Sequence, residues 1–416
     1  MDVWEMTRMR THLRRIVWMA ILAAPAYAQQ AWEPFGALPG GARTGAVGMN
    51  HRGAILVVGG RPFVGPDLQA SAHYLRPGDN VWRTGTPLDG PIVHQGGGID
   101  SLGRPVVFGG FEPHAGWTRE GYVYDLKEGP TDGIADMPAW RIYFAGCADG
   151  EGRLYCIGGQ DLLGHGTRTV YRFDARTDQW SELAPMPQER FYAAAVYDGR
   201  GHVLVVGGYD MFKGRRESSV FSYDIAADRW ELLADVPHTG VSLPGLGLGA
   251  DGKVYCIGGY TGQNPNSGTI SRLVYVFDPD TRLWSAGPAL TQPREHPAVV
   301  LSDDGYLYAI GGYQIGVGTD TVERLKTGEG GGGVPCEDVS KLTAKCLGSG
   351  RVKGKVILRD RRHSGENVTI EIDGQPFSPA IKGRKAKFAE CCFQGAIAVA
   401  LIDPGDCLPP EPLTCP

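Results

Sequence analysis

The chain has 416 residues and a net charge of −5, and 62 of its residues are glycine. Such a length can bury a large core and, taken alone, suggests two or three domains. Residues 29–333 carry 25 Lys and Arg against 34 Asp and Glu, whereas residues 334–416 carry 12 against 10. Because nucleic-acid binding depends on neutralising phosphates, the acidic larger part argues against nucleic acid as a partner.

Residues 1–28 are typical of a secretion signal. They contain four arginines between residues 8 and 15, an apolar segment over residues 16–24, and an A-x-A cleavage site at residues 26–28. The apolar segment is too short to span a bilayer. An uncleaved anchor is the alternative. We therefore expect an exported protein, periplasmic or extracellular, that has no membrane span.

A glycine doublet repeats six times and organises the following residues. The doublets are 49 to 53 residues apart, and each follows a short apolar segment: Gly59-Gly60, Gly109-Gly110, Gly158-Gly159, Gly207-Gly208, Gly258-Gly259 and Gly311-Gly312. A fixed period of this size is typical of a modular array with one small sheet per repeat. We expect glycine here because a buried strand ends in a turn that needs positive φ or close backbone packing.

Each repeat continues with a strand that ends in an aromatic residue and an aspartate, and most repeats then have a tryptophan. The third repeat contains Tyr171, Asp174 and Trp180. The equivalents are Tyr223, Asp224 and Trp230; Phe277, Asp278 and Trp284; Tyr74 and Trp82; and Tyr124 and Asp125. This is hairpin chemistry, in which the aspartate closes the turn through its own backbone. The indole is expected to pack between adjacent sheets.

This pattern resembles the kelch repeat and covers residues 31–325. The resemblance implies an all-β fold, a β-propeller in which each repeat forms a blade of four antiparallel strands. The sixth repeat lacks its last strand, while the residues around Trp32 have the character of a fourth strand without the first three. We expect this strand to pair beside Val322 and to close a six-bladed ring over residues 29–327, which removes both exposed sheet edges.

Residues 328–335 form a glycine-rich linker, and residues 336–416 differ in character from the repeats. Short alternating segments broken by turns predict a small antiparallel β-sandwich. Six cysteines are candidates for disulfides: Cys336, Cys346, Cys391, Cys392, Cys407 and Cys415. An even number of cysteines in a small exported module favours disulfides, with the pairing left open. Zinc is the alternative, but the segment has one histidine, His363, and no C-x-x-C.

Basic residues recur before the doublets. Three arginines stand 17 residues before a first glycine, a fourth stands 16 before, and we place two other residues at the equivalent positions of the second and fifth repeats: Arg141, Arg190, Arg294, Arg43, His94 and Val241. The resemblance implies that these loops meet on one face of the propeller. Guanidinium groups around the central opening would then bind carboxylates. The alternative is that each arginine only caps neighbouring loops.

The loops after the doublets add further candidates for ligand binding on the same face. These are Arg61, Trp117, Tyr209 and Phe212. Exposed aromatic rings beside charged groups suit a sugar or an acidic peptide. For a tyrosine directly after a doublet, such as Tyr209, the alternative is packing on the next blade.

The resemblance also leaves an enzyme open. Exported kelch proteins include sialic-acid mutarotases, which implies an arginine-bound sugar carboxylate and a proton-transfer group, for which the candidates are Glu112, Asp161, His94 and His296. Copper-radical oxidases use a kelch propeller with tyrosine, histidine and a thioether cysteine. Of the three propeller cysteines, Cys147, Cys156 and Cys256, the last two lie in buried-strand segments, which argues against that chemistry. No Ser-His-Asp elbow, H-E-x-x-H or phosphate-binding loop occurs.

We therefore predict a binding protein without a cofactor or metal, whose loop face recognises a protein or an anionic glycan. The alternative is a mutarotase or epimerase that acts on sialic acid or a related acidic sugar in the same pocket. The oligomeric state is left open.

Overall fold

The computed structural model describes residues 31–328 except for residues 40, 42–43, 61–69, 91, 113–115, 265–266 and 315–316, and eight strands beyond residue 338. All regular structure in these residues is β-strand. No helix among them is long and apolar enough to cross a bilayer. The expected secretion signal and residues 329–335 of the expected linker lie outside the described residues.

Residues 33–326 form six four-stranded antiparallel sheets, here called blades one to six in chain order. Blade one contains β2 (Val47–His51), β3 (Ala54–Val58), β4 (Ala72–Leu75) and β5 (Arg83–Thr84). Blade two contains β6 (Gly96–Ile99), β7 (Pro105–Glu112), β8 (Gly116–Asp125) and β9 (Gly129–Ile134). Blade three contains β10 (Ala145–Ala148), β11 (Leu154–Ile157), β12 (Val170–Asp174) and β13 (Gln179–Leu183).

The later blades keep the same order but carry small ladders in their loops. Blade four contains β14 (Ala194–Tyr197), β15 (His202–Val206), β18 (Val220–Asp224) and β19 (Arg229–Leu233). Blade five contains β21 (Gly245–Leu248), β22 (Val254–Ile257), β25 (Val274–Asp278) and β26 (Leu283–Ala286), and blade six contains β27 (Ala298–Leu301), β28 (Tyr306–Ile310), β31 (Thr321–Lys326) and β1 (Glu33–Ala37). The ladders are β16 (Tyr209–Asp210) with β17 (Arg215–Arg216), β20 (Val241–Ser242) with β23 (Tyr260–Thr261) and β24 (Thr269–Ile270), and β29 (Tyr313–Gln314) with β30 (Val317–Gly318).

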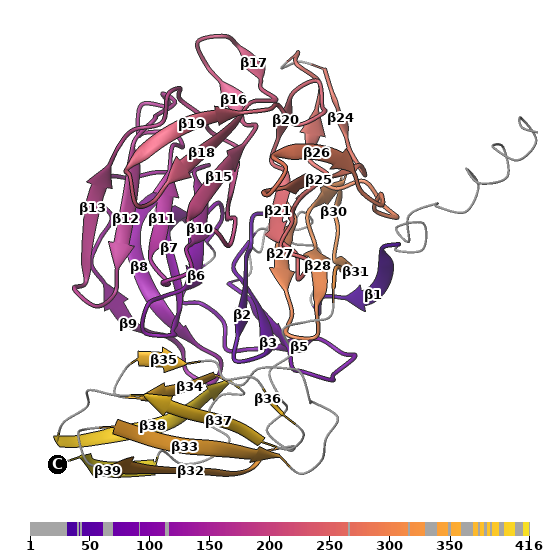
Figure 1. Cartoon of the computed structure of the whole chain (residues 1–416). Coiled ribbons are helices and arrows are strands. Elements are labelled where there is room, and N and C mark those ends of the chain that lie inside the picture. Colours follow the sequence, from indigo (N-terminus) through magenta and orange to yellow (C-terminus); the bar gives the residue numbers. More distant parts are fainter. Residues whose placement is uncertain are drawn as a thin grey trace, which may run out of the picture.

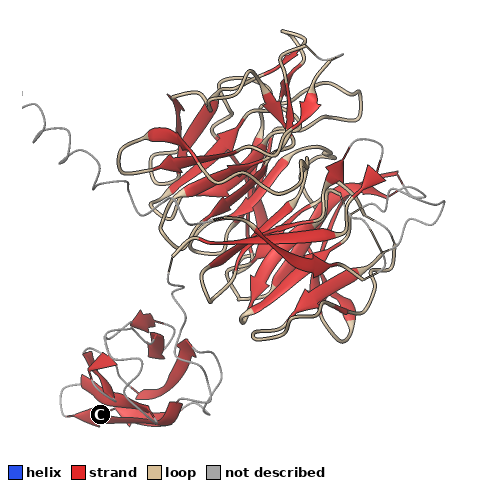
Figure 2. Cartoon of the chain, turned by 90° about the vertical axis from the view of Figure 1, so that its right-hand side faces the viewer, coloured by secondary structure: helices blue, strands red, loops and turns tan. Residues whose placement is uncertain are grey.

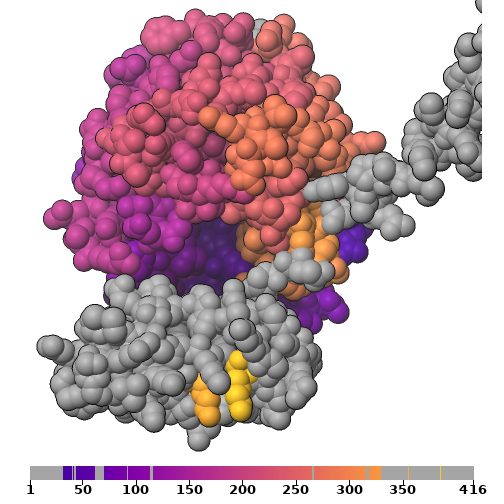
Figure 3. All heavy atoms as spheres, in the orientation of Figure 1, coloured from indigo at the N-terminus to yellow at the C-terminus, as the bar shows by residue number. Residues whose placement is uncertain are grey.

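The blades form a closed ring. The first strand of each blade contacts the first strand of the next, in the order β2, β6, β10, β14, β21 and β27, and β27 contacts β2 again. Figures 1 and 2 show these sheets from two sides. In the space-filling view, the magenta and orange segments form the upper part of the propeller, and indigo and violet atoms form its lower part (Figure 3).

The amino-terminal strand closes this ring as the sequence predicts. β1 pairs antiparallel with β31, and Pro34 lies opposite Glu323. Trp32 is 3% exposed and packs with Leu325 in the core between blades five and six. Its indole donates a hydrogen bond to the Pro288 carbonyl oxygen at 2.9 Å. The expectation of an all-β propeller is therefore confirmed, with the last blade built from both ends of the repeat region.

The glycine doublets join each blade to the next. All twelve doublet glycines have positive φ, from 60° to 104°. In the doublet of blade five, Gly258 N–H donates to Leu273 O in its own blade, and Gly259 N–H donates to Arg294 O in blade six at 2.9 Å. A Cβ built on Gly258 would lie 2.2 Å from that Arg294 oxygen. The predicted need for positive φ and close backbone approach is thus observed at the doublets.

The tryptophans and aspartates also lie where the repeat predicts. Trp230 on β19 donates its indole N–H to Ala184 O of the preceding blade at 2.8 Å, and Trp180 bonds Ala135 O in the same way. Asp224 accepts hydrogen bonds from the backbone N–H groups of Ala226 and Ala227. The indoles therefore bridge neighbouring sheets, and the aspartates close the outer hairpins.

Beyond residue 338 the described strands form two four-stranded antiparallel sheets. One contains β32 (Val339–Leu347), β33 (Arg351–Leu358), β36 (Ile381–Lys382) and β37 (Lys385–Glu390), and the other contains β34 (Thr369–Ile372), β35 (Gln375–Phe377), β38 (Gly395–Asp403) and β39 (Glu411–Cys415). β32 contacts β39, so the two sheets adjoin. The six cysteine side chains of this part fall outside the described residues, and their disulfides stay a prediction.

Candidate functional site

The arginines predicted to line the central opening lie instead in the interior of the propeller. Arg141 is 7% exposed, Arg190 is 1% exposed and Arg294 is fully buried. Arg294 donates to the carbonyl oxygens of Gly311 and Thr321 and forms an ion pair of 2.5 Å with Glu323. The proposal that these three groups present a shared anion site is therefore wrong, because their guanidinium donors already serve blade atoms.

Arg190 and Arg141 are held in the same manner. Arg190 forms an ion pair with Asp210 at 3.2 Å and donates to the Ser219 hydroxyl oxygen at 2.8 Å. Arg141 donates to Trp140 O and to the Thr169 hydroxyl oxygen. The alternative named in the sequence analysis, that these arginines bind neighbouring loops, describes them correctly.

The other residues predicted to bind a ligand beside these arginines have separate outcomes. Arg43 and Arg61 lie outside the described residues, so their role stays a prediction. Val241 is buried, and its carbonyl oxygen accepts a hydrogen bond from Gly208 N–H. In blade two, the Ile92 carbonyl oxygen accepts the hydrogen bond from the N–H group of Gly60 in the preceding doublet. Ile92, and not His94, is therefore the structural equivalent of the arginines.

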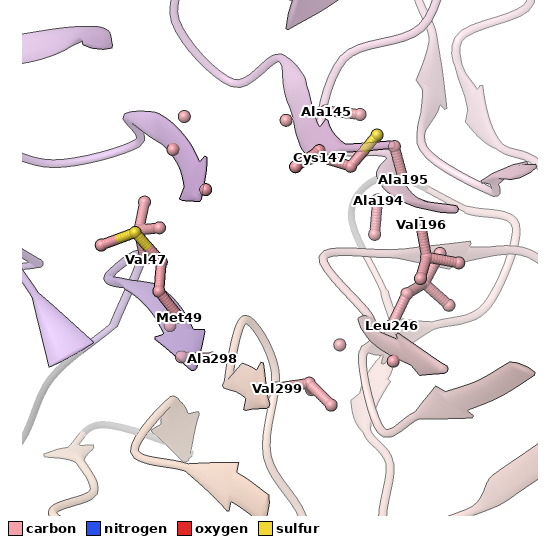
Figure 4. Close-up of a pocket in the computed structure, with 18 of the residues that line it drawn as sticks. Val47, Met49, Ala145, Cys147, Ala194, Ala195, Val196, Leu246, Ala298 and Val299 are labelled. Carbon is pink, nitrogen blue, oxygen red and sulfur yellow. The ribbon is translucent and has the colours of Figure 1, made fainter. Parts of the chain in front are cut away.

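The first strands of the six blades enclose a central channel. Its cavity has a volume of about 480 Å³ and is lined mainly by glycine, alanine and valine. Figure 4 shows small side chains such as Val47, Ala194 and Val299 around the open centre. Small residues fit here because adjacent first strands approach closely; for example, a Cβ on Gly48 would lie 2.4 Å from Val300 Cγ2. The channel wall itself therefore offers few polar side chains to a ligand.

One end of the channel has a different character. Six residues with positive φ stand there, one per blade: Gly45, His94, Tyr143, Tyr192, Leu243 and His296. Backbone hydrogen bonds link them from blade to blade, as from Tyr192 N–H to Tyr143 O at 2.9 Å and from His296 N–H to Leu243 O at 2.7 Å. Non-glycine residues in this region carry strain that the surrounding structure must offset, and such strain clusters at functional sites.

Four of these side chains form a continuous arc of rings. The His94 and His296 rings stack with centroids 5.3 Å apart, His94 lies 4.4 Å from Tyr143, and Tyr143 lies 4.3 Å from Tyr192. The two imidazoles come from blades two and six and meet across Gly45 of blade one. A Cβ on Gly45 would lie 3.0 Å from His296 Cε1, so glycine permits this stacking. All four residues are half-buried.

Glu295 adds an acidic group beside these rings. Burial raises the pKa of Glu295 to about 7, and the nearby Arg216 guanidinium opposes the rise. Burial also lowers the pKa of His296 to about 4, so this imidazole is neutral at pH 7. Burial raises the pKa of Tyr192, with smaller contributions from Tyr143 and Glu295. We call His94, Tyr143, Tyr192, Glu295 and His296 the channel mouth.

Sequence reasoning found His94 and His296 but missed Glu295 and the two tyrosines. Glu295 makes a backbone bridge with Tyr313, the residue that follows the doublet of its own blade. The same bridge is made in other blades by Val93, Ile142 and Phe191, and Ser242 pairs equivalently with Tyr260. A carboxylate at a position that is apolar in three other repeats was the signal that could have identified Glu295.

The other predicted candidates do not lie together in one site. Glu112 lies at the end of β7, where burial raises its pKa. Asp161 accepts hydrogen bonds from Leu163 and His165 N–H and so holds its own loop. Trp117 lies opposite Phe111 on β8, the Tyr209 ring lies 5.2 Å from Phe191, and Phe212 is 92% exposed. Tyr209 therefore packs on Phe191 of its own blade, and not on the next blade as its alternative stated.

The propeller cysteines are separate from the channel mouth. Cys147, Cys156 and Cys256 are buried free thiols, and burial raises the pKa of each. Cys156 and Cys256 lie on the second strands β11 and β22, whereas Cys147 lies in the channel wall (Figure 4). Within the described residues, no group of three or more His, Cys, Asp or Glu side chains could hold a metal ion.

Comparisons with known proteins identify the class. Residues 141–187, 190–237 and 249–291 match the Kelch motif family, and these segments correspond to blades three, four and five. These matches show kelch repeats in three of the six blades, and the closed ring of sheets is a β-propeller.

Several individual proteins resemble this chain. Human Kelch repeat and BTB domain-containing protein 13 is 30% identical over 135 residues, which is 30% of this chain and 29% of that relative's length. YjhT has a similar structure, with a TM-score of 0.59 and 17% identity over 70% of this chain and 96% of YjhT. A fungal alcohol oxidase of the AA5 family, in complex with copper, has a TM-score of 0.56 and 15% identity over 92% of this chain and 99% of its own. At these identities the two structures show a shared fold.

Proposed function

We propose that this protein is a binding propeller whose channel mouth recognises a glycan. A kelch propeller fold supports a binding role in general. The observation that supports a sugar is the arc of four half-buried rings, His94, His296, Tyr143 and Tyr192, around one end of the channel. Aromatic faces stack on the apolar faces of sugars, and phenol and imidazole groups can exchange hydrogen bonds with sugar hydroxyls.

The charge preference of this site differs from the sequence expectation. Arg141, Arg190 and Arg294 are committed to the interior, so they give no support to an anionic glycan. The cation that acts on the pKa of Glu295 is Arg216, which lies 4.2 Å over the Tyr260 ring and donates to Asn264 O at 2.7 Å. Arg216 is 8% exposed and its donors serve loop atoms, so we propose hydroxyl groups, and not a carboxylate, as the recognition element.

Replacing Tyr143 with alanine is expected to weaken glycan binding at least about tenfold, because one of the two inner rings of the arc is lost. Saturation-transfer NMR and calorimetric titration of the full chain with N-acetylglucosamine and N-acetylneuraminic acid would measure it. Tyr275→Ala is the control, since Tyr275 is half-buried on β25 and packs on His238, away from the mouth. Unchanged affinity in Tyr143→Ala, or binding of neither sugar by the wild-type chain, would overturn the proposal.

A sugar mutarotase or epimerase is the second candidate for the same mouth, and Glu295 is the observation in its favour. With a pKa of about 7, this carboxyl group is populated in both protonation states near neutral pH, as a general acid–base group requires. His296 stays neutral across that range because its pKa is about 4. Glu295, rather than His296, would therefore determine the pH dependence of the reaction.

If this activity is present, anomer exchange of sialic acid followed by NMR should change with pH around 7 in the wild-type protein. Glu295→Gln cannot titrate, so its residual rate should be at least about 100-fold lower and flat with pH between 6 and 8. The control is Glu112→Gln, which removes a carboxyl group from the β7 end. No acceleration of exchange by the wild-type protein would eliminate the enzyme and leave the binding proposal intact.

We further propose that the protein is exported. Support comes from the arginine-rich and apolar residues 1–24 followed by the A-x-A site at residues 26–28. Amino-terminal sequencing of the exported protein should begin at Gln29, and a retained residue 1 in the cytoplasm would contradict it.

A further inference from the structure

Two neighbouring loops of the propeller expose apolar side chains that the glycan proposal does not use. Leu162 and Leu163 follow the doublet of blade three and are 55% and 77% exposed. Met211 and Phe212 follow the doublet of blade four, at the tip of the β16–β17 hairpin near the top of Figure 1, and are 40% and 92% exposed. We call these four residues the rim patch.

Hydrogen bonds hold both loop tips in place with these side chains outward. Asp161 accepts from the N–H groups of Leu163 and His165, and Gly164 N–H donates back to Asp161 O at 2.9 Å. At the other tip, Glu189 accepts from the N–H groups of Met211 and Phe212 at 3.1 and 3.3 Å. The exposure of the rim patch is therefore a fixed feature of the fold. Binding would cost little conformational entropy, because the two loop tips are already ordered.

Glu189 also places the two loops next to each other. A Cβ built on Gly166, in the blade-three loop, would lie 2.9 Å from the Glu189 carboxylate that binds the blade-four tip. The two apolar pairs thus belong to two loops that both contact the Glu189 side chain. Exposed apolar residues on adjacent rigid loops are characteristic of an interaction surface.

The charged groups around the rim patch are arranged asymmetrically. The carboxylates Asp210 and Glu217 are turned inward, with side chains 5% and 10% exposed, and they hold Lys213 and Arg215 by ion pairs. The cations themselves stay accessible, at 41% and 44% exposure. Arg168, at the end of the blade-three loop, is exposed as well. The outer surface therefore combines apolar groups with three accessible cations, and Asp161, at 32% exposure, is the carboxylate of the blade-three loop.

We propose that the rim patch docks an acidic, amphipathic segment of another protein, with apolar anchors on the rim patch and carboxylates beside Lys213 and Arg215. Aromatic and methionine side chains are enriched among the anchors of protein interfaces, and the charges favour carboxylates on the partner. This surface is distinct from the channel mouth, so a sugar and a protein segment could bind the same propeller.

The test uses a phage-displayed library of linear peptides selected on the full chain, with the selected peptides titrated individually. Selected peptides should combine apolar and acidic residues. Phe212→Ser should weaken them at least about tenfold, and so should Lys213→Glu. Leu283→Ser is the matched control because Leu283 is 65% exposed on β26, away from the rim patch. Tyr143→Ala at the channel mouth should leave peptide affinity unchanged.

Several results would overturn this inference. Peptides without acidic residues, peptides insensitive to Phe212→Ser, or an empty selection would each do so. A wild-type dimer in sedimentation velocity that Phe212→Ser abolishes would assign the rim patch to a second copy of the chain. Binding to anionic phosphatidylserine vesicles that the same substitution abolishes would assign it to a lipid surface. Melting temperatures of all variants check that the fold is retained.

Discussion

Gly258→Ala is expected to destabilise the propeller by about 3 kcal/mol or more, although the substitution adds only one methyl group. Two costs combine. Gly258 has a φ of 62°, which strains any residue with a Cβ. The added methyl group would also lie 2.2 Å from the Arg294 carbonyl oxygen, a backbone atom of blade six that cannot rotate away. The contact between blades five and six would have to open.

The control for this substitution separates strain from crowding. Gly103 has a similar φ of 74°, but a Cβ there would meet no atom within 4 Å. Gly103→Ala should therefore cost only the strain, about 1 kcal/mol. Chemical denaturation of both variants, with the denaturant slope compared to that of the wild type, gives the two free energies of unfolding. Equal losses would show that the close contact between blades contributes nothing.

Arg294→Ala is expected to cost about 3–5 kcal/mol of folding stability, because it leaves the Glu323 carboxylate buried without its cation. The Arg294 side chain is fully buried and that of Glu323 is 2% exposed. Glu323 also accepts hydrogen bonds from the Thr291 and Gln292 N–H groups, which tie the chain before blade six to β31. Loss of the pair would therefore loosen the loop that precedes the final blade.

Thermal and chemical denaturation would measure this effect, and two further variants define its origin. Arg229→Ala removes an arginine that is 76% exposed and 3.6 Å from Asp224, and it should cost less than about 0.5 kcal/mol. Adding Glu323→Gln to Arg294→Ala should recover part of the loss, because the unpaired charge is removed. If Arg294→Ala kept wild-type stability while glycan binding disappeared, the buried structural role assigned to Arg294 would be wrong.

The repeat signals were sufficient to predict the fold because they are local. A doublet needs positive φ at its own position, an aspartate closes its own hairpin, and alternation assigns one face of a strand to the core. The closing strand was also predictable, since β31 had no fourth strand after it and the residues after Trp32 lacked their first three. An unpaired edge in a ring of sheets is unfavourable, so the two had to meet.

The arginines show why the same reasoning failed for the site. Their spacing placed Arg141, Arg190 and Arg294 correctly at the same point of each blade, but spacing carries no information about which acceptors surround a side chain. Glu323 lies 29 residues after Arg294 in sequence and 2.5 Å away in space. Such partners turn a guanidinium group toward the interior, where burial without them would be costly.

The sequence by itself determined the architecture of this protein, since period, turn chemistry and strand pattern act over a few neighbouring residues. Only the tertiary structure decided the site. The stacking of His94 on His296 across Gly45, the placement of Glu295 near Arg216 and the shared support of the rim patch by Glu189 each join residues from different blades. Contacts of that kind depend on how closed sheets face one another, and the pattern of a single repeat does not contain that information.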